Sequence, residues 1–259
     1  MLNFIILQDS WNEEDDRELY DYLDSKDIKY QLMSANEISN LFINETINVE
    51  VIFCDTKIMK DYIIKNHLWL NIRKYPEFFN SVYNRKIKKL TLTEVKNKSF
   101  PYFVKPIDND KDFGGMVVTN MLEKIYFKSC VIDKLDNYQV YFSAIVKFVN
   151  EFRLFILDNK IYGITDCSKY LINPEDIITQ SPPEYILKEI IELNRYRDCV
   201  IDIGRLDIGR LDNSIWSVVE VNPPYSLTSY DYPVEQYYNY CKLVFKNLHQ
   251  LIWYTYVNF

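Results

Sequence analysis

Histidine is scarce in this chain of 259 residues, which contains only two, His67 and His249. Because they lie far apart in the sequence, the pattern does not support a zinc site built on histidines or a Ser-His-Asp triad. If the protein binds a metal ion, the sequence predicts that oxygen atoms hold it.

Patterned cysteines and long apolar runs are also missing. The five cysteines are scattered, form no C-x-x-C pair and leave an odd count, which reduced thiols in a cytosol explain most simply. The apolar segment 1–7 is short, lacks a basic start and runs into the acidic stretch EEDDRE. It predicts neither a signal peptide nor a membrane span, so we expect a cytoplasmic protein with no membrane partner.

Basic residues are in deficit, since the formal net charge is −7. This balance argues against broad nucleic-acid binding, although a local basic run, RKIKK, occupies residues 85–89. Asn, Ile, Lys and Tyr are abundant, which is typical of an AT-rich genome such as that of a phage, a large DNA virus or a low-GC bacterium. For a viral protein the expected compartment is the cytoplasm of the host cell.

Glycine is rare, so the positions of the five glycines are informative. Gly114 and Gly115 follow a short strand-like segment that carries Lys105, within SFPYFVKPIDNDKDFGGMVV at 99–118. A lysine supplies positive charge for a phosphate, and paired glycines let backbone amides approach that phosphate closely. The segment predicts a loop that covers phosphate groups, with Lys111 as a second basic candidate.

Acidic residues cluster around the strand-like segment IWSVVEVN at 215–222. Glu220 and Asn222 lie two positions apart, so their side chains leave the same face of a strand. Upstream, CVIDIGRLDIGRLD supplies Asp202, Asp207 and Asp212 before a predicted turn at 213–214. An Asp, Glu and Asn set suits Mg²⁺, whose remaining ligands are waters and nucleotide phosphates. The alternative is an ordinary hairpin with acidic residues near its turn.

A long apolar segment, VYFSAIVKFVNEFRLFIL at 140–157, connects the lysine loop with the acidic hairpin. Polar residues interrupt this segment, and two strands joined by a hinge fit it best. Glu151 and Arg153 lie in its second half, and Lys169 follows after another turn.

The order of these features resembles the ATP-grasp superfamily, and within it a clade named for one arginine and two lysines. The motifs that carry the resemblance are EFRLF at 151–155, DIGRL at 202–206 and VEVN at 219–222. The likeness extends from about Lys86 to Tyr230. It implies an α+β fold in which two lobes hold ATP between them.

The resemblance also implies roles for individual residues. Lys105 and Lys169 would contact the phosphates of ATP, Glu151 its ribose hydroxyls, and Glu220 and Asn222 a Mg²⁺ ion together with one hairpin aspartate. The backbone at 146–148 would face the adenine, and a basic residue of the linker would add a further contact. The linker candidates are Arg85, Lys86, Lys88 and Lys89, of which Lys86 is favoured. The residues expected to bind the nucleotide are Lys86, Lys105, Lys111, Gly114, Gly115, Val146, Lys147, Phe148, Glu151 and Lys169. The residues expected to act in catalysis are Lys105, Lys169, Arg153 and Arg205.

Two departures from the family pattern leave the metal aspartate and one arginine open. The pentapeptide IGRLD occurs twice, so both Asp202 and Asp207 precede Glu220. The family spacing matches Asp207, whereas Asp202 continues a natural strand and is slightly favoured, because a modestly longer hairpin loop costs well under ~1 kcal/mol. Ligases of the superfamily often carry an arginine two residues before this aspartate, where the present chain has Val200. The candidates to replace that arginine are Arg205, Arg210 and Arg153.

The expected architecture is an ATP-grasp fold of α+β type that follows a small Rossmann-like lobe. Residues 1–90 would form that first lobe, and residues 91–259 the nucleotide-binding and catalytic lobes. Apolar runs predict strands at 2–9 and 49–55, and amphipathic segments predict helices at 12–25, 57–69, 75–83, 183–197 and 234–256.

The function implied by the resemblance is an ATP- and Mg-dependent carboxylate-amine ligase that works through an acyl-phosphate. Its partners would be small molecules, peptides or proteins that carry the carboxylate and the amine. Segment 223–233, PPYSLTSYDYP, would shape the acceptor pocket, with Ser226, Ser229 and Tyr230 as contacts. Two alternatives remain open: a kinase that phosphorylates a hydroxyl, and a non-catalytic module that binds a nucleotide or a protein.

Overall fold

The computed structural model describes residues 4–9, 13–44, 49–65, 72–107, 113–131, 137–178, 180–207, 215–225 and 228–257. In this part of the chain the strands form three sheets, one parallel and two antiparallel. The Asn213-Ser214 turn, Lys111 and Ser226 lie outside the described residues.

The N-terminal lobe is a three-stranded parallel sheet with the strand order β2-β1-β3. Its strands are β1 (Phe4–Gln8), β2 (Tyr30–Met33) and β3 (Val49–Phe53), and its helices are α1 (Glu13–Ser25), α2 (Ala35–Asn44) and α3 (Thr56–Lys65). The buried apolar side chains of β1 and β3 explain why this sheet lies inside the lobe. The sequence predicted β1, α1, β3 and α3, whereas β2 and α2 were not predicted.

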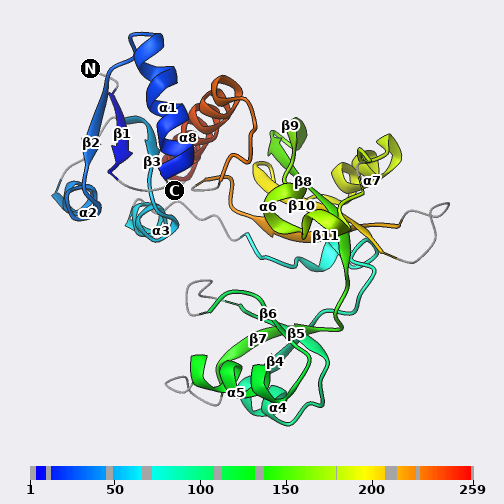
Figure 1. Cartoon of the computed structure of the whole chain (residues 1–259). Coiled ribbons are helices and arrows are strands. Elements are labelled where there is room, and N and C mark those ends of the chain that lie inside the picture. Colours follow the sequence, from blue (N-terminus) through cyan, green and yellow to red (C-terminus); the bar gives the residue numbers. More distant parts are fainter. Residues whose placement is uncertain are drawn as a thin grey trace.

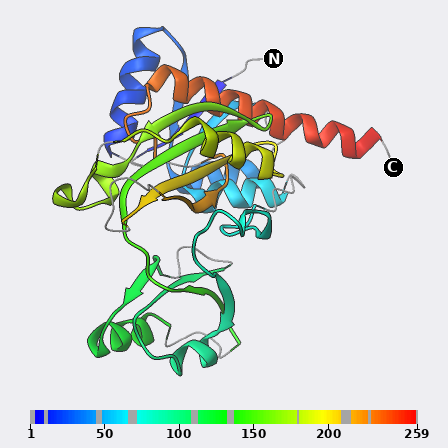
Figure 2. The same cartoon turned by 90° about the vertical axis from the view of Figure 1, so that its right-hand side faces the viewer.

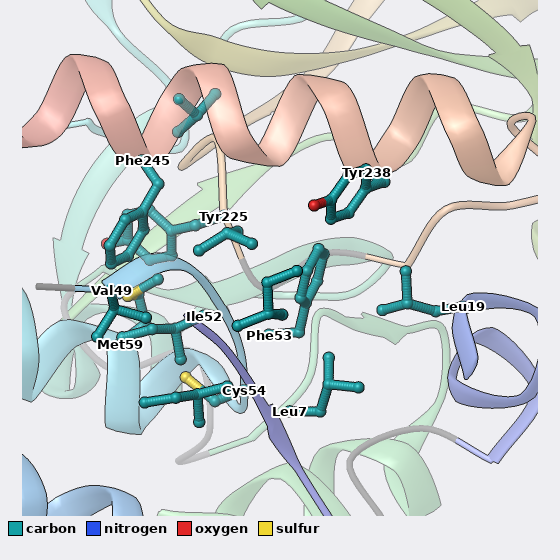
Figure 3. Packing of buried hydrophobic residues seen from close by; sticks show 14 of the residues in the cluster. Leu7, Leu19, Val49, Ile52, Phe53, Cys54, Met59, Tyr225, Tyr238 and Phe245 are labelled. Atoms are coloured by element: carbon teal, nitrogen blue, oxygen red, sulfur yellow. The ribbon is translucent and has the colours of Figure 1, made fainter. Parts of the chain in front are cut away.

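The last helix, α8 (Val234–Val257), packs against this N-terminal lobe. The Phe53 and Tyr238 rings stack with centroids 6.4 Å apart, and the Tyr62 and Phe245 rings stack at 5.6 Å. Figure 3 shows these aromatic side chains of α8 pointing down onto β3 and its neighbours. The helix predicted at 234–256 is thus confirmed, and it joins the two ends of the chain in one hydrophobic core.

The segment that follows the first lobe is not the helix predicted at 75–83. Only a short 3-10 turn, η1 (Glu77–Phe79), forms there, and the backbone instead continues along the outer edge of β11 (Ile215–Asn222). Val221 N donates to Lys74 O and Val218 N donates to Val82 O, both at 2.9 Å. The apolar spacing that suggested a helix is real, but these side chains are buried against the sheet from a segment of short turns.

The small lobe is a four-stranded antiparallel sheet with the order β4-β7-β5-β6. Its elements are β4 (Lys88–Thr91), α4 (Leu92–Lys96), β5 (Tyr102–Pro106), β6 (Met116–Val118), α5 (Met121–Cys130) and β7 (Gln139–Ser143). Thr91 and Glu94 form a capping box that starts α4. Figures 1 and 2 show this lobe set apart from the rest, connected by the chain before β4 and after β7.

The third sheet is antiparallel with the order β11-β10-β8-β9. Besides β11 it contains β8 (Phe148–Leu157), β9 (Lys160–Asp166) and β10 (Cys199–Leu206), and it is accompanied by α6 (Ser168–Leu171), η2 (Pro174–Asp176) and α7 (Glu184–Leu193). All of β10 is buried, which requires cover on both faces. One face packs on α7 and the aromatic residues before β4, and the other faces α8 at one end and the small lobe at the other.

Candidate functional site

A cavity of about 330 Å³ lies between the small lobe and the third sheet. Strands from both lobes contribute its walls, so it is the place where distant parts of the sequence meet. Its lining residues are Tyr75, Arg85, Phe103, Lys105, Gly115, Val117, Ser143, Ala144, Ile145, Val146, Phe148, Glu151, Arg153, Leu171, Asp202, Val219, Glu220 and Tyr230.

Glu220, on β11, forms the acidic end of this cavity. Its carboxylate forms an ion pair with Lys105 from β5, and Lys74 Nζ lies 3.7 Å from Oε1. Burial acts to raise the pKa of Glu220, but Lys74 and Lys105 outweigh it and lower that pKa to about 2. Glu220 is therefore ionised at neutral pH and neutralised by two ammonium groups.

Asp202 lies directly opposite Glu220 in the register of β10 and β11. Arg153, its neighbour on β8, donates to both carboxylate oxygens at 2.8 and 2.9 Å. Asn222 Nδ2 donates to Asp202 at 2.9 Å and to Glu220 at 3.1 Å. The strand pairing thus gathers the Asp, Glu and Asn side chains that the sequence grouped together.

These three side chains fit a Mg²⁺ ion. Two carboxylates and the Asn222 carbonyl, which now accepts from Lys74, are hard oxygen ligands on one face of a rigid sheet. Within the described ranges no group of three or more His, Cys, Asp or Glu residues could hold a metal. The protein would accordingly supply few ligands, and the remaining positions suit waters and phosphate oxygens, as is usual for Mg²⁺.

Asp207, the other aspartate considered from the sequence, lies elsewhere. It is exposed beyond the end of β10, where its backbone N donates to Lys147 O at 2.9 Å and its carboxylate lies 3.8 Å from Lys147 Nζ. It does not line the cavity. The structure therefore brings Asp202, and not Asp207, next to Glu220.

Much of the cavity wall is apolar. Phe103 and Val117 from the small lobe face the connection between β7 and β8, where Val146 and Phe148 lie. Gly115 also lines the cavity, and a Cβ added there would meet the Phe103 ring at 2.9 Å. Flat apolar walls of this kind suit a planar heterocycle.

Glu151, on β8, is a buried carboxyl group that also lines the cavity. Burial is the main cause that raises its pKa to about 8, and repulsion from Asp202 and Glu220 adds to the effect. At neutral pH this side chain is mostly protonated, so it can donate a hydrogen bond as well as accept one.

Two basic residues of the segment before β4 reach the site, and the sequence favoured neither. Lys74 was not among the candidates, and it contacts Glu220 and Asn222. Arg85, one of the linker candidates, lines the cavity and donates to Val219 O at 2.9 Å. Its Nη1 is buried without a hydrogen-bond partner in the described part of the chain. Lys86, the linker residue favoured from the sequence, is exposed and does not line the cavity. The side chains of this segment alternate between exposed and partly buried, so Lys86 lies on the exposed side.

Several other predicted residues are not among the residues that line the cavity. Arg205 is buried on the other face of the sheet, since it is an odd number of positions from Asp202 on the same strand. Lys147 turns outward to Asp176, at 2.6 Å, and Lys169 pairs with Asp231 on the surface. Gly114 does not line the cavity.

The sequence matches a known protein family. Residues 83–240 match family 2 of the ATP-grasp domains in the clade named for one arginine and two lysines. A search of curated protein sequences finds no match. No helix in the described ranges is long and apolar enough to cross a membrane.

Solved structures show the same fold. D-alanine–D-alanine ligase from Bacillus anthracis is similar over 97% of this chain and 99% of that chain, with 13% identity and a TM-score of 0.54. Its complex with ATP is similar over 97% and 98%, with 14% identity and a TM-score of 0.57. The predicted ATP-grasp fold and α+β class are confirmed. Since the family match covers more than half of its length, this chain belongs to the ATP-grasp domain family of the clade named for one arginine and two lysines.

Proposed function

We propose that this protein is an ATP- and Mg-dependent ligase that joins a carboxylate to an amine through an acyl-phosphate. The observation that carries the proposal is the meeting of Lys74, Lys105, Asp202, Glu220 and Asn222 at one end of a cavity. A scaffold that binds nothing has no physical reason to bury so many mutually compensating charges.

The nucleotide fits the cavity in one orientation. The apolar walls at Phe103 and Phe148 suit the base, and the protonated Glu151 suits the ribose hydroxyls. The phosphates then extend toward Lys74 and Lys105, whose ammonium groups now neutralise Glu220. Mg²⁺ held by Asp202, Glu220 and Asn222 would offset the phosphate charge and release both lysines to bind the phosphates.

The proposed reaction has two steps. A substrate carboxylate oxygen attacks the γ-phosphorus of ATP, the bond to the bridging oxygen breaks, and ADP leaves. The amine nitrogen of the second substrate then attacks the acyl carbon, and inorganic phosphate leaves with the C–O bond electrons while the amine loses a proton. No side chain acts as a nucleophile in this scheme, and the charged residues that line the cavity are Arg85, Lys105, Glu151, Arg153, Asp202 and Glu220.

Arg153 is the residue best placed to steady the acyl-phosphate. The position two residues before Asp202 is Val200, which is buried against the hydrophobic core that contains α8, so no cation is available there. The Arg153 guanidinium reaches the same aspartate from the neighbouring strand and also lines the cavity. It would supply the missing positive charge from β8 instead of β10.

Isothermal titration calorimetry with the non-hydrolysable ATP analogue AMP-PNP tests the nucleotide site. Mg²⁺ should strengthen binding at least tenfold in the wild type, and Glu220→Gln should abolish this dependence. Lys105→Met should weaken binding with or without the metal. Glu192→Gln, which removes an exposed ion pair with Lys188 on α7, should change nothing. A wild-type protein that does not bind AMP-PNP would refute the proposal.

The products distinguish the reaction classes. A ligase releases inorganic phosphate and forms an amide when a carboxylate and an amine are supplied together. A kinase would transfer the phosphate to a stable hydroxyl ester, and a non-catalytic module would bind AMP-PNP with no turnover of ATP on any substrate pair.

A further inference from the structure

The chain after β11 adopts a left-handed backbone at the mouth of the cavity, as Asp158 and Asn159 do in the turn between β8 and β9. Tyr230 has φ 51° and Asp231 has φ 60°, so two consecutive residues other than glycine lie in the left-handed region. Such conformations cost free energy and persist only where surrounding contacts impose them, often at ligand sites. The local contacts of Asp231 therefore matter.

Three contacts impose this backbone. Thr165 Oγ1 donates to Tyr230 O at 2.6 Å, and Arg153 Nη1 donates to Thr228 O at 2.9 Å. The Arg153 guanidinium also lies over the Tyr230 ring, 4.5 Å from its centroid. Because Arg153 holds Asp202 at the same time, the segment 228–231 is tied directly to the acidic end of the cavity.

This backbone conformation leaves the carboxylate of Asp231 exposed to solvent. The Asp231 side chain is half exposed, and it forms an ion pair with Lys169 Nζ and accepts from Tyr170 Oη at 2.5 Å. These two partners lower the pKa of Asp231. Tyr230, which precedes Asp231, and Leu171, which follows its partner Tyr170, both line the cavity, so Asp231 lies at its rim. In this structure, then, a carboxylate at the cavity mouth already holds a primary ammonium ion.

We propose that Asp231 binds an ammonium group of the amine substrate, and that Lys169 occupies this position until a nucleotide is bound. The inference rests on the proposed ligase function and names the charge of its second substrate. It makes Asp231 a specificity-determining residue, which favours cationic acceptors and repels anionic ones at the cavity mouth.

Lys169 can leave Asp231 at little cost in free energy. The Lys169 side chain is 60% exposed and long, and exposed ion pairs contribute little to stability, so little holds it on Asp231. Bound nucleotide phosphates carry more negative charge than one carboxylate and would draw the ammonium group away. Asp231 stays behind, fixed by its backbone, with one hydrogen bond from Tyr170 and room for a new cation.

The carboxylate substrate would bind elsewhere. Asp231 would repel it, whereas Arg153 lines the cavity and Lys74 contacts Glu220, another lining residue, so both provide positive charge there. The two substrates are thus separated by charge, with the anion near the phosphates and the cation at the rim. This separation brings the acyl group and the amine together without allowing either to take the other's place.

The test uses L-lysinamide, which carries both an α- and an ε-amine, and its diacetyl derivative, which has the same skeleton without an ionisable amine. Calorimetry would measure binding of each to wild type, Asp231→Asn, Lys169→Met and the control Glu192→Gln, with Mg-AMP-PNP present and absent. Asparagine tolerates the left-handed backbone of residue 231, so the Asp231→Asn protein should stay folded.

We expect L-lysinamide to bind the wild type and the control several-fold more tightly with Mg-AMP-PNP than without it. Asp231→Asn should lose this binding, and Lys169→Met should bind the amine even without nucleotide. The diacetyl compound should bind to none of them.

Two results would overturn the inference while leaving the nucleotide site intact. One is equal affinity of wild type and Asp231→Asn for L-lysinamide, and the other is no binding of L-lysinamide to a wild-type protein that does bind Mg-AMP-PNP. Failure to bind Mg-AMP-PNP itself would instead refute the proposed function, and the inference with it.

Discussion

Lys74, which follows the N-terminal lobe, places its ammonium group 3.7 Å from Oε1 of Glu220 on β11. The contact depends on the backbone of segment 74–82, which hydrogen-bonds along the edge of β11 and so fixes Lys74 beside the carboxylate. A residue before the matched family region thereby becomes part of the cavity's charged end.

Lys74→Met is expected to weaken binding of Mg-AMP-PNP by roughly tenfold or more, because charge-assisted contacts of this kind are worth about 1.5–3 kcal/mol. Lys86→Met is the matched control, since Lys86 is an exposed basic residue of the same linker and should change the affinity little. Calorimetry on both variants measures the difference. Equal affinities would remove Lys74 from the nucleotide site.

The helix predicted in the linker is wrong because the structure of this segment depends on contacts with residues far away in the sequence. Tyr75, Phe79, Val82 and Tyr83 have helical spacing and are all buried, so the apolar signal was correct. The backbone forms short local turns and two hydrogen bonds with β11 instead of a regular helix, and β11 lies far along the sequence. The side on which a basic residue emerges depends on that long-range pairing, which explains why Lys86 was favoured and Lys74 was not considered.

Other parts of the fold could be predicted because their signals are local. The apolar alternation of β11 placed Glu220 and Asn222 on one face, and the apolar runs of β8 and β10 identified buried strands. By contrast, the choice between Asp202 and Asp207 depends on the register of β10 against β11. Because IGRLD is repeated, β10 could pair with β11 in two registers of similar composition. Tertiary packing selects the register that buries Asp202.

Substitutions of Asp202 and Asp207 test which of the two aspartates binds the metal ion. Asp202→Asn should weaken Mn²⁺ binding, measured by electron paramagnetic resonance with AMP-PNP present, at least tenfold, whereas Asp207→Asn should leave it unchanged. Asp202→Asn should also lower the melting temperature, because it leaves the buried Arg153 without its counter-ion, a loss of about 3–5 kcal/mol. The titration is therefore made below that temperature. Weaker Mn²⁺ binding in Asp207→Asn alone would reverse the assignment.

Glu151 makes a specific contribution to the pH dependence of stability. Its pKa is about 8 in the folded protein, above the ordinary value of 4.5, so the folded state binds more protons between these limits. The free energy of unfolding therefore falls as pH rises through this window, and the stability is fully present only below about pH 4.5. Each unit of the difference corresponds to about 1.4 kcal/mol, so the loss is on the order of several kcal/mol.

Glu151→Gln should remove this dependence. Urea denaturation at pH 5.5, 7 and 9 would give the free energy of unfolding of wild type and variant, and their difference isolates Glu151 from other titrating groups. We expect the variant to gain stability relative to wild type as the pH rises. A difference that does not change with pH would show that the pKa of Glu151 is not raised in the folded protein.

The two adjacent glycines of the small lobe differ sharply in what surrounds them. A Cβ at Gly115 would meet the Phe103 ring at 2.9 Å, while nothing lies within 4 Å of one at Gly114. Phe103 forms the apolar wall of the cavity, so Gly115→Ala should push its ring toward the space that the base would fill. We expect several-fold weaker binding of Mg-AMP-PNP in Gly115→Ala and unchanged binding in Gly114→Ala. Calorimetry on the pair distinguishes this steric effect from a general stiffening of the loop, which would weaken binding in both variants equally.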